Sequence, residues 1–231
     1  MNAQMTAYNF LKDHILTGKL PASAPINPAE IGKKLGLSRM PVREAVLQLE
    51  AEGLITFGAN RRPVVTALTP KDILERFEIR IVLETLAIER AVTRLTPEIF
   101  GELELQLVRM EHVASDPKRW LLLHDEFHDM IYVHAEMPRL FEEIHRLRQS
   151  IRPYLLMYID LYQGPEMPGV EHGSLLRVLR GGDPASARSA LTEHIRNAGA
   201  GVVYFLMNGK EKMPARPDKK KSTQPSMVGS L

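Results

Sequence analysis

The chain has 231 residues, of which 44% are apolar, 25% charged and 6% aromatic, and its formal net charge is +2. This is ordinary globular composition, which excludes a collagen-like or wholly disordered chain. Because cysteine is absent, disulfide frameworks, thiolate zinc sites and thiol catalysis are excluded as well. No apolar run reaches the roughly 20 residues of a membrane span, and the first residues lack a secretory pattern. We therefore expect a cytoplasmic protein with no membrane partner.

The charge is distributed unevenly along the chain. Residues 1–69 balance at +3, residues 70–208 at −5 and residues 209–231 at +4. The basic segment 1–69 could bind a polyanion, which the acidic segment 70–208 would repel. The last segment is polar and contains several prolines, so we expect 209–231 to be a disordered basic tail.

Three helices followed by a hairpin are predicted before residue 69. The first two are marked by apolar positions at helical spacing, Ala7, Leu11 and Ile15 in one and Ile31 and Leu35 in the other. The third is expected to follow Ser38, a typical N-cap residue, and its apolar stripe consists of Val42, Ala45, Val46 and Leu49. Two β-type runs, 54–57 and 63–68, flank a Gly- and Asn-containing turn that predicts a hairpin. This order is typical of a winged helix-turn-helix.

In such a fold the start of the third helix faces the base edges of DNA. Arg39 and Arg43 are four residues apart, opposite the apolar stripe, and an arginine fork can bond guanine O6 and N7 together. Ser38 and the free N–H groups beside it can hold a phosphate. The other candidate DNA contacts are Lys33 and Lys34, and Arg61 and Arg62 at the hairpin tip. A three-helix module that binds protein, with solvated arginines, is the alternative.

Residues 70–208 are predicted to form an antiparallel bundle of about six helices, because no β-rich run follows residue 68 and proline-containing breaks divide the segment. The expected fold is therefore mainly α. A winged helix-turn-helix domain covers 1–69, an all-helical domain covers 70–208, and the tail covers 209–231.

Seven of the eight histidines lie after residue 111. His124 and His128 have the i, i+4 spacing that lets two imidazoles bind one ion, and a bundle can add His172 and His194 from other helices. Ordinary surface or core histidines are the alternative. The segment HDEFH also resembles a hydrolase motif, but Glu126 is one residue from the place that H-E-x-x-H requires. A metal-dependent hydrolase is therefore only a remote alternative.

The segment SRMPVREAVLQLEAEGLI (38–55) resembles the SRxPVREAL-x-L-x-x-EGL signature of GntR-family bacterial transcriptional regulators, and FLKDHILTGKLP (10–21) is similar to the family's first helix. The resemblance implies that Arg39 and Arg43 contact operator bases. The tip Asn60-Arg61-Arg62 departs from the family's N-R-G and adds a charge there.

The segment FEIRIVLETLAIERAV (77–92) resembles the opening of the FadR-type effector domain, called FCD, and later landmarks of that domain occur at 127–128, 171–172, 182–183 and 194. Many FCD domains bind a divalent metal through Asp, His, His and His. The resemblance implies that His128, His172 and His194 are ligands, while His124 stands where the Asp is usual. Two ligand sets stay open, four histidines or three histidines with Asp125, and helix geometry favours His124.

Imidazole ligands suit zinc or nickel, with iron and copper as further options. Four neutral imidazoles around a divalent ion make a positive site that favours an anion, and the resemblance implies a small carboxylate or sugar acid as effector. Candidate carboxylate partners are Arg80, Arg148 and Arg152, with helix–helix ion pairs as their alternative role. The chain is thus expected to be no enzyme but a homodimeric regulator that binds double-stranded operator DNA under effector control. A metal-sensing regulator without organic effector is the alternative.

Overall fold

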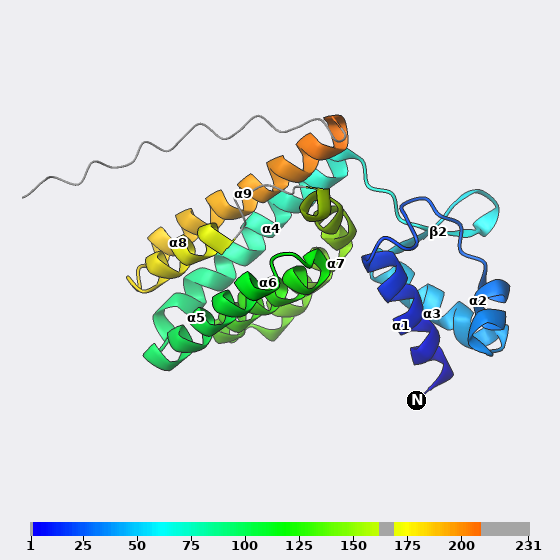
Figure 1. Cartoon of the computed structure of the whole chain (residues 1–231), viewed down its shortest axis with the longest axis horizontal. Coiled ribbons are helices and arrows are strands. Elements are labelled where there is room, and N and C mark those ends of the chain that lie inside the picture. The colour runs from blue at the N-terminus through cyan, green and yellow to red at the C-terminus, as the bar shows by residue number, and fades with distance from the viewer. Residues whose placement is uncertain (1, 162–168, 209–231) are drawn as a thin grey trace, which may run out of the picture.

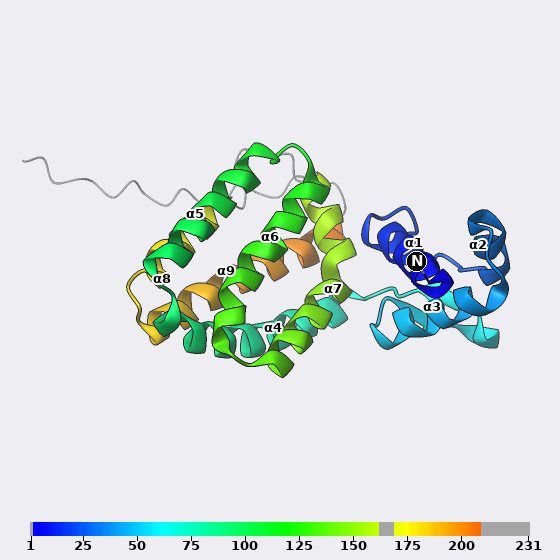
Figure 2. The same ribbon diagram turned by 90° about the horizontal axis from the view of Figure 1, so that it is seen from below.

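The computed structural model describes residues 2–161 and 169–208. A small N-terminal part and a larger helical body are connected by a thin segment of chain after β2 (Figures 1 and 2), and helices α1 (Ala3–Leu16) and α7 (Pro138–Leu161) of the two parts also contact each other. Within the described ranges, buried apolar side chains form one cluster between Ala7 and Val65 and another between Ile73 and Val202. Each part therefore has its own core. The predicted tail, 209–231, lies outside the described residues.

The N-terminal part is a winged helix-turn-helix, as predicted. Its elements are α1 (Ala3–Leu16), α2 (Pro28–Leu35), α3 (Arg39–Ala51), β1 (Ile55–Phe57) and β2 (Pro63–Val65). The α1 stripe predicted from the sequence is buried, and α1 packs against α3. The apolar stripe of α3 is buried in this packing, and the opposite face of the helix is exposed to solvent.

Two glycines shape the turn between α2 and α3. Gly36 caps α2 in the left-handed conformation, with a φ of 66°, which costs glycine little. A Cβ on Gly32 would lie 2.8 Å from the carbonyl oxygen of Leu37, closer than real Cβ atoms come. The absence of side chains at these two positions lets α3 start close to the end of α2.

The hairpin is present, but its strands are shorter than the runs that predicted it. β1 and β2 are antiparallel, with Ile55 opposite Val65, and the tip is a 3-10 turn at Ala59–Arg61. Asn60 and Arg61 both have positive φ, 63° and 52°, which is uncommon for an arginine. The second run was expected to continue to residue 68, whereas β2 ends at Val65 and the chain turns toward the body.

The body is the predicted bundle. Its helices are α4 (Pro70–Ala91), α5 (Pro97–His112), α6 (Pro117–Tyr132), α7 (Pro138–Leu161), α8 (Gly169–Leu179) and α9 (Pro184–Asn208). Five of these six begin at a proline, whose missing N–H costs nothing in a first turn. Thr69 and Asp72 add a capping box to α4. These local signals are the proline-containing breaks from which the sequence predicted a bundle of about six helices.

Helix α9 lies along α4, and α7 packs on α4 as well (Figure 1). Helices α5, α6 and α8 complete the bundle, with α5 in contact with both α6 and α8. Helix α8 also packs against α9, and α6 packs against α4 and α7. No helix in the described ranges combines the length and hydropathy that a membrane crossing requires.

Candidate metal centre and nucleic-acid interface

The start of α3 is open to solvent. Arg39 and Arg43 are exposed there, and Ser38 is the N-cap residue, although its side chain makes no capping hydrogen bond. The hydroxyl is thus not committed to capping its own helix. This placement suits the predicted contacts of the two arginines and Ser38 with DNA, which stay predictions.

The other basic candidates in the N-terminal part, which we call the head, lie on two different elements. Lys33 and Lys34 are exposed near the end of α2, and the Lys34 ammonium lies 5.0 Å from the centre of the Phe10 ring. Arg61 and Arg62 are exposed at the hairpin tip. The positive φ of Arg61 belongs to the turn itself, so the local backbone decides where this pair points.

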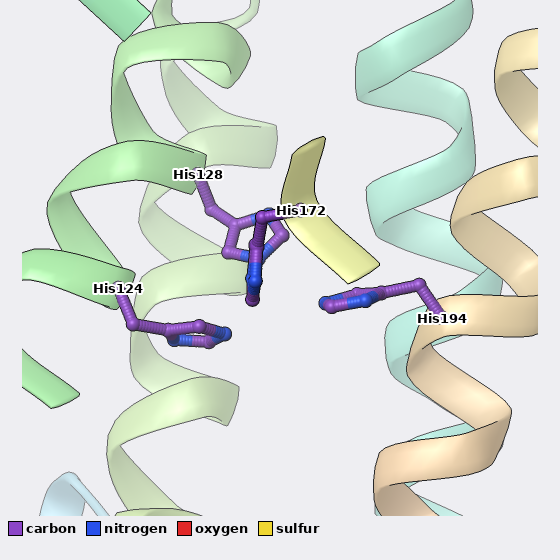
Figure 3. A group of neighbouring side chains, drawn as sticks. All are labelled: His124, His128, His172 and His194. Atoms are coloured by element: carbon purple, nitrogen blue, oxygen red, sulfur yellow. The ribbon is translucent and has the colours of Figure 1, made fainter. Parts of the chain in front are cut away.

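Four histidines from three helices meet inside the bundle (Figure 3). His124 and His128 come from α6, His172 from α8 and His194 from α9. One ring nitrogen from each lies within 4.8 Å of the others. The ring centres of His124 and His128 are 4.7 Å apart, and those of His172 and His194 are 4.6 Å apart. Residues that are 70 positions apart in sequence therefore form a group that could hold one metal ion.

Burial lowers the pKa of three of these imidazoles, those of His124, His128 and His194, and so favours their neutral form. Burial lowers the pKa of His128 well below its ordinary value, and His124 and Arg148 lower it further. Burial, then the charges of His124 and Arg80, lower the pKa of His194 to about 3. A neutral imidazole has a free lone pair, which is the form that binds a metal.

One polar atom of the cluster supports a cation. Nε2 of His128 is buried and has no hydrogen-bond partner among the described residues. A buried polar atom without a partner costs free energy, and a bound cation would offset that cost. The donor set and this atom fit a divalent transition metal.

Aromatic rings line the site. Trp120, one turn before His124, stacks on it with ring centres 5.0 Å apart and an angle of 29°. The rings of Phe127 and His172 are nearly perpendicular, at 88°, with their centres 5.3 Å apart. Both aromatic side chains are buried, so they limit the movement of the imidazoles and keep water away from them.

Asp125 is next to the cluster but not in it. It forms ion pairs with Arg148, at 2.7 Å, and with Arg152, and it lies 3.6 Å from Nδ1 of His124. Burial would raise its pKa, but the Arg148 guanidinium holds it well below the usual range. Of the two ligand sets left open by the sequence, the structure brings together the one with four histidines.

The three arginines predicted to bind an effector are paired inside the chain. Arg80 binds Glu84 at 2.6 Å, Arg148 binds Asp125 and Asp129, and Arg152 binds Asp125. All three are buried. This is the ion pairing that the sequence left open as their alternative role, and a contact with an anion stays a prediction.

Sequence reasoning missed two residues beside the cluster. The Tyr132 hydroxyl donates a hydrogen bond of 2.7 Å to Oε2 of Glu84, and it lies 3.4 Å from Nδ1 of His128. Tyr132 is one helical turn after His128, a spacing that could have suggested the contact. Glu84, by contrast, is on α4, and only the fold brings it here.

A third missed residue connects the two parts of the molecule. The Tyr154 hydroxyl on α7 accepts a hydrogen bond of 2.6 Å from the backbone N–H of Leu68, which lies between β2 and α4. Tyr154 is two residues after Arg152, which pairs with Asp125 beside the cluster. One helix therefore contacts both the surroundings of the histidines and the connection to the head.

Comparisons with known proteins agree with both parts of the structure. The family model for bacterial regulatory proteins of the gntR family matches residues 3–65, and the FCD domain model matches residues 75–197. The HTH-type transcriptional regulator YdhC of Bacillus subtilis is 28% identical over 88% of this chain and 92% of its own length. A probable D-xylose utilization operon transcriptional repressor of Paenarthrobacter nicotinovorans is 31% identical, covering 81% of this chain and 83% of that protein.

A solved structure is similar over nearly the whole chain. E. coli McbR/YncC has a TM-score of 0.76 and 25% identity, covering 90% of this chain and 100% of that one. The likeness therefore includes the head, the body and their connection.

Proposed function

Because this chain belongs to the gntR family of bacterial regulatory proteins and carries an FCD domain, we propose that a small carboxylate-type anion, bound at a divalent metal in the four-histidine cluster, controls its affinity for operator DNA. The chain is a DNA-binding transcriptional regulator, and its matched families and relatives are regulators rather than enzymes. The proposal adds the metal, the anion and their control of DNA binding.

DNA is read, in this proposal, by the winged helix-turn-helix domain at 1–69. Arg39 and Arg43 contact bases, while Ser38 and the start of α3 hold a phosphate. The remaining basic side chains, Lys33, Lys34, Arg61 and Arg62, contact the backbone or the minor groove. Their solvent exposure supports these roles.

The observation that carries the metal proposal is the convergence of four imidazoles inside the domain at 70–208. His124, His128, His172 and His194 would hold zinc or nickel, with iron and copper also compatible. The metal would supply a fixed positive charge and, in an expanded coordination shell, a position for an oxygen ligand. A doubly positive site without a carboxylate ligand should attract an anion.

A second function is favoured by the same donor set. Zinc prefers four ligands, and four histidines would fill a tetrahedral shell. The metal alone would then stiffen the bundle and act as the signal. Sugars are a further class of candidate effector to test beside carboxylates, because the name of one relative refers to D-xylose utilization.

A route from the site to the head is supported by the contacts of α7. Asp125 follows His124 directly and pairs with Arg148 and Arg152, and Tyr154 bonds to the connection at Leu68. A change around His124 would move these arginines and shift the helix that holds the connection. A coupling of about 1.4 kcal/mol suffices to change operator affinity tenfold.

The test measures operator affinity of the full chain in three states, using an operator selected from randomised duplexes at fixed salt. Chelator-treated protein is compared with protein loaded with Zn²⁺ or Ni²⁺, and then with succinate, gluconate or D-xylose added. We expect a change of about tenfold or more when a carboxylate joins the loaded protein. A change caused by the metal alone would favour the metal-sensing function, and identical affinities in all states would contradict both.

We also propose that the regulator acts as a homodimer. On α4, Ile79, Val82 and Leu86 share one face and are 44%, 65% and 37% exposed, a stripe that a second copy would cover. We expect the full chain to sediment at twice 26.1 kDa and the Val82→Glu variant to dissociate. The control is Leu105→Glu, which alters a residue on α5 that is 51% exposed. A wild-type monomer would contradict the proposal.

A further inference from the structure

A buried chain of polar side chains leads from α4 to one histidine of the cluster. Arg80 donates to Oε1 of Glu84 at 2.6 Å, and the Tyr132 hydroxyl donates to Oε2 of the same carboxylate at 2.7 Å. The Tyr132 oxygen lies 3.4 Å from Nδ1 of His128. All four residues are at most 4% exposed, so water does not compete for these contacts.

The hydrogen positions in this series of polar contacts can be assigned by counting donors and acceptors. A carboxylate only accepts, and a hydroxyl has a single proton. Because that proton points to Glu84, the Tyr132 oxygen can only accept from His128. The N–H of the neutral imidazole must then be on Nδ1, and the lone pair must be on Nε2.

Nε2 is the atom of His128 that is buried without a hydrogen-bond partner among the described residues. The proton is thus placed on the nitrogen that contacts tyrosine, and the lone pair on the nitrogen left for the cluster. In metal sites, a partner on the other ring nitrogen commonly fixes the tautomer and the ring orientation of a histidine ligand.

We propose that Tyr132 is a positioning residue for the metal site, which holds His128 in the Nδ1–H tautomer so that Nε2 faces the ion. This inference rests on the proposed metal binding. Glu84 orients the hydroxyl, and Arg80 keeps the carboxylate paired. Through Glu84, the ligand histidine is tied to α4, the helix that directly follows the connection to the head.

His124 is supported by different neighbours. Its Nδ1 lies 3.6 Å from the Asp125 carboxylate, and its ring stacks on Trp120. The partner of His124 is thus a carboxylate that also pairs with Arg148, whereas the partner of His128 is a hydroxyl oriented by Glu84.

The first experiment reads the tautomer directly in the metal-free full chain. Protein labelled with ¹⁵N-histidine is studied by long-range ¹H–¹⁵N correlation, and the His128 signals are assigned from their loss in His128→Gln. We expect His128 to carry its proton on Nδ1 in the wild type and to lose this preference in Tyr132→Phe. A wild-type His128 with its proton on Nε2 would overturn the inference, even if the variant does not fold.

The second experiment measures Zn²⁺ and Ni²⁺ affinity by competition with a chelating indicator. Tyr132→Phe should weaken binding by roughly 10- to 100-fold, the usual effect of removing such a partner. The matched control is Tyr8→Phe, because Tyr8 also donates a 2.7 Å hydrogen bond to a glutamate, Glu52, but does so in the head. The control should bind metal like the wild type.

The outcomes separate this inference from the proposed function. If the wild type binds metal and Tyr132→Phe binds it equally well, the positioning role is wrong and the metal site stands. If the wild type binds neither metal, the metal site is wrong and the positioning role falls with it. Equal weakening in Tyr8→Phe and Tyr132→Phe would show a general loss of stability and would also overturn the inference.

Discussion

Replacing either Arg39 or Arg43 with alanine should weaken binding to the selected operator by about tenfold or more, and replacing both should leave only sequence-independent binding. Each bidentate contact with a guanine contributes about 1–3 kcal/mol of discrimination. Both side chains are exposed at the start of α3, so truncation removes a contact without opening a cavity. Fluorescence anisotropy at one fixed salt concentration, on selected and scrambled duplexes, measures the effect.

The matched control is Arg139→Ala on α7. The Arg139 side chain is 92% exposed and pairs with Glu142 in the body, so this variant also loses one surface guanidinium. It should bind operator like the wild type. If the Arg39/Arg43 double variant keeps the preference for the selected over the scrambled duplex, the prediction that these two arginines contact bases is wrong.

Replacing His128 with glutamine should abolish the thermal stabilisation that Zn²⁺ or Ni²⁺ gives to the wild type. At a metal concentration about 100 times the dissociation constant, a bound ligand stabilises a protein by about 2.7 kcal/mol, or roughly 5–10 °C for a chain of this size. His128 is 1% exposed and faces the other three imidazoles, so its loss removes a central ligand. Melting curves of chelator-treated protein, with and without metal, measure the difference.

His112→Gln is the control for this variant. His112 is exposed at the end of α5, where its Nδ1 contacts the backbone oxygen of Val108, and it is outside the cluster. The chain's one tryptophan, Trp120, stacks on His124 and should report Ni²⁺ binding by quenching in the wild type and the control. Metal stabilisation that survives in His128→Gln would contradict the four-histidine site.

The secondary structure could be predicted from the sequence because the residues that indicate it are local in the chain. Proline in the first turn marks the start of α4, α5, α6, α7 and α9, and the spacing of Ala7, Leu11 and Ile15 predicted the buried face of α1. The second hairpin strand is shorter than predicted, and three residues after its end the backbone N–H of Leu68 bonds to Tyr154 of α7, a tertiary contact that local sequence signals do not reveal.

The candidate site could be predicted from the sequence only in part. The i, i+4 spacing of His124 and His128 predicts that they share a face of one helix, whereas the approach of His194 depends on how α9 packs. The partners of Arg80, Arg148 and Arg152 were left open, because the sequence does not say which carboxylates the fold brings near. Glu84 was missed for the same reason, as it lies 48 positions from Tyr132.

The metal site is tested most directly by element-specific scattering from crystals of the full chain loaded with Zn²⁺ or Ni²⁺. Data collected on both sides of the metal's absorption edge should give one anomalous peak inside the bundle, bonded to His124, His128, His172 and His194. Density that bonds the ion to Asp125 in place of His124, or no peak between these helices, would contradict the account.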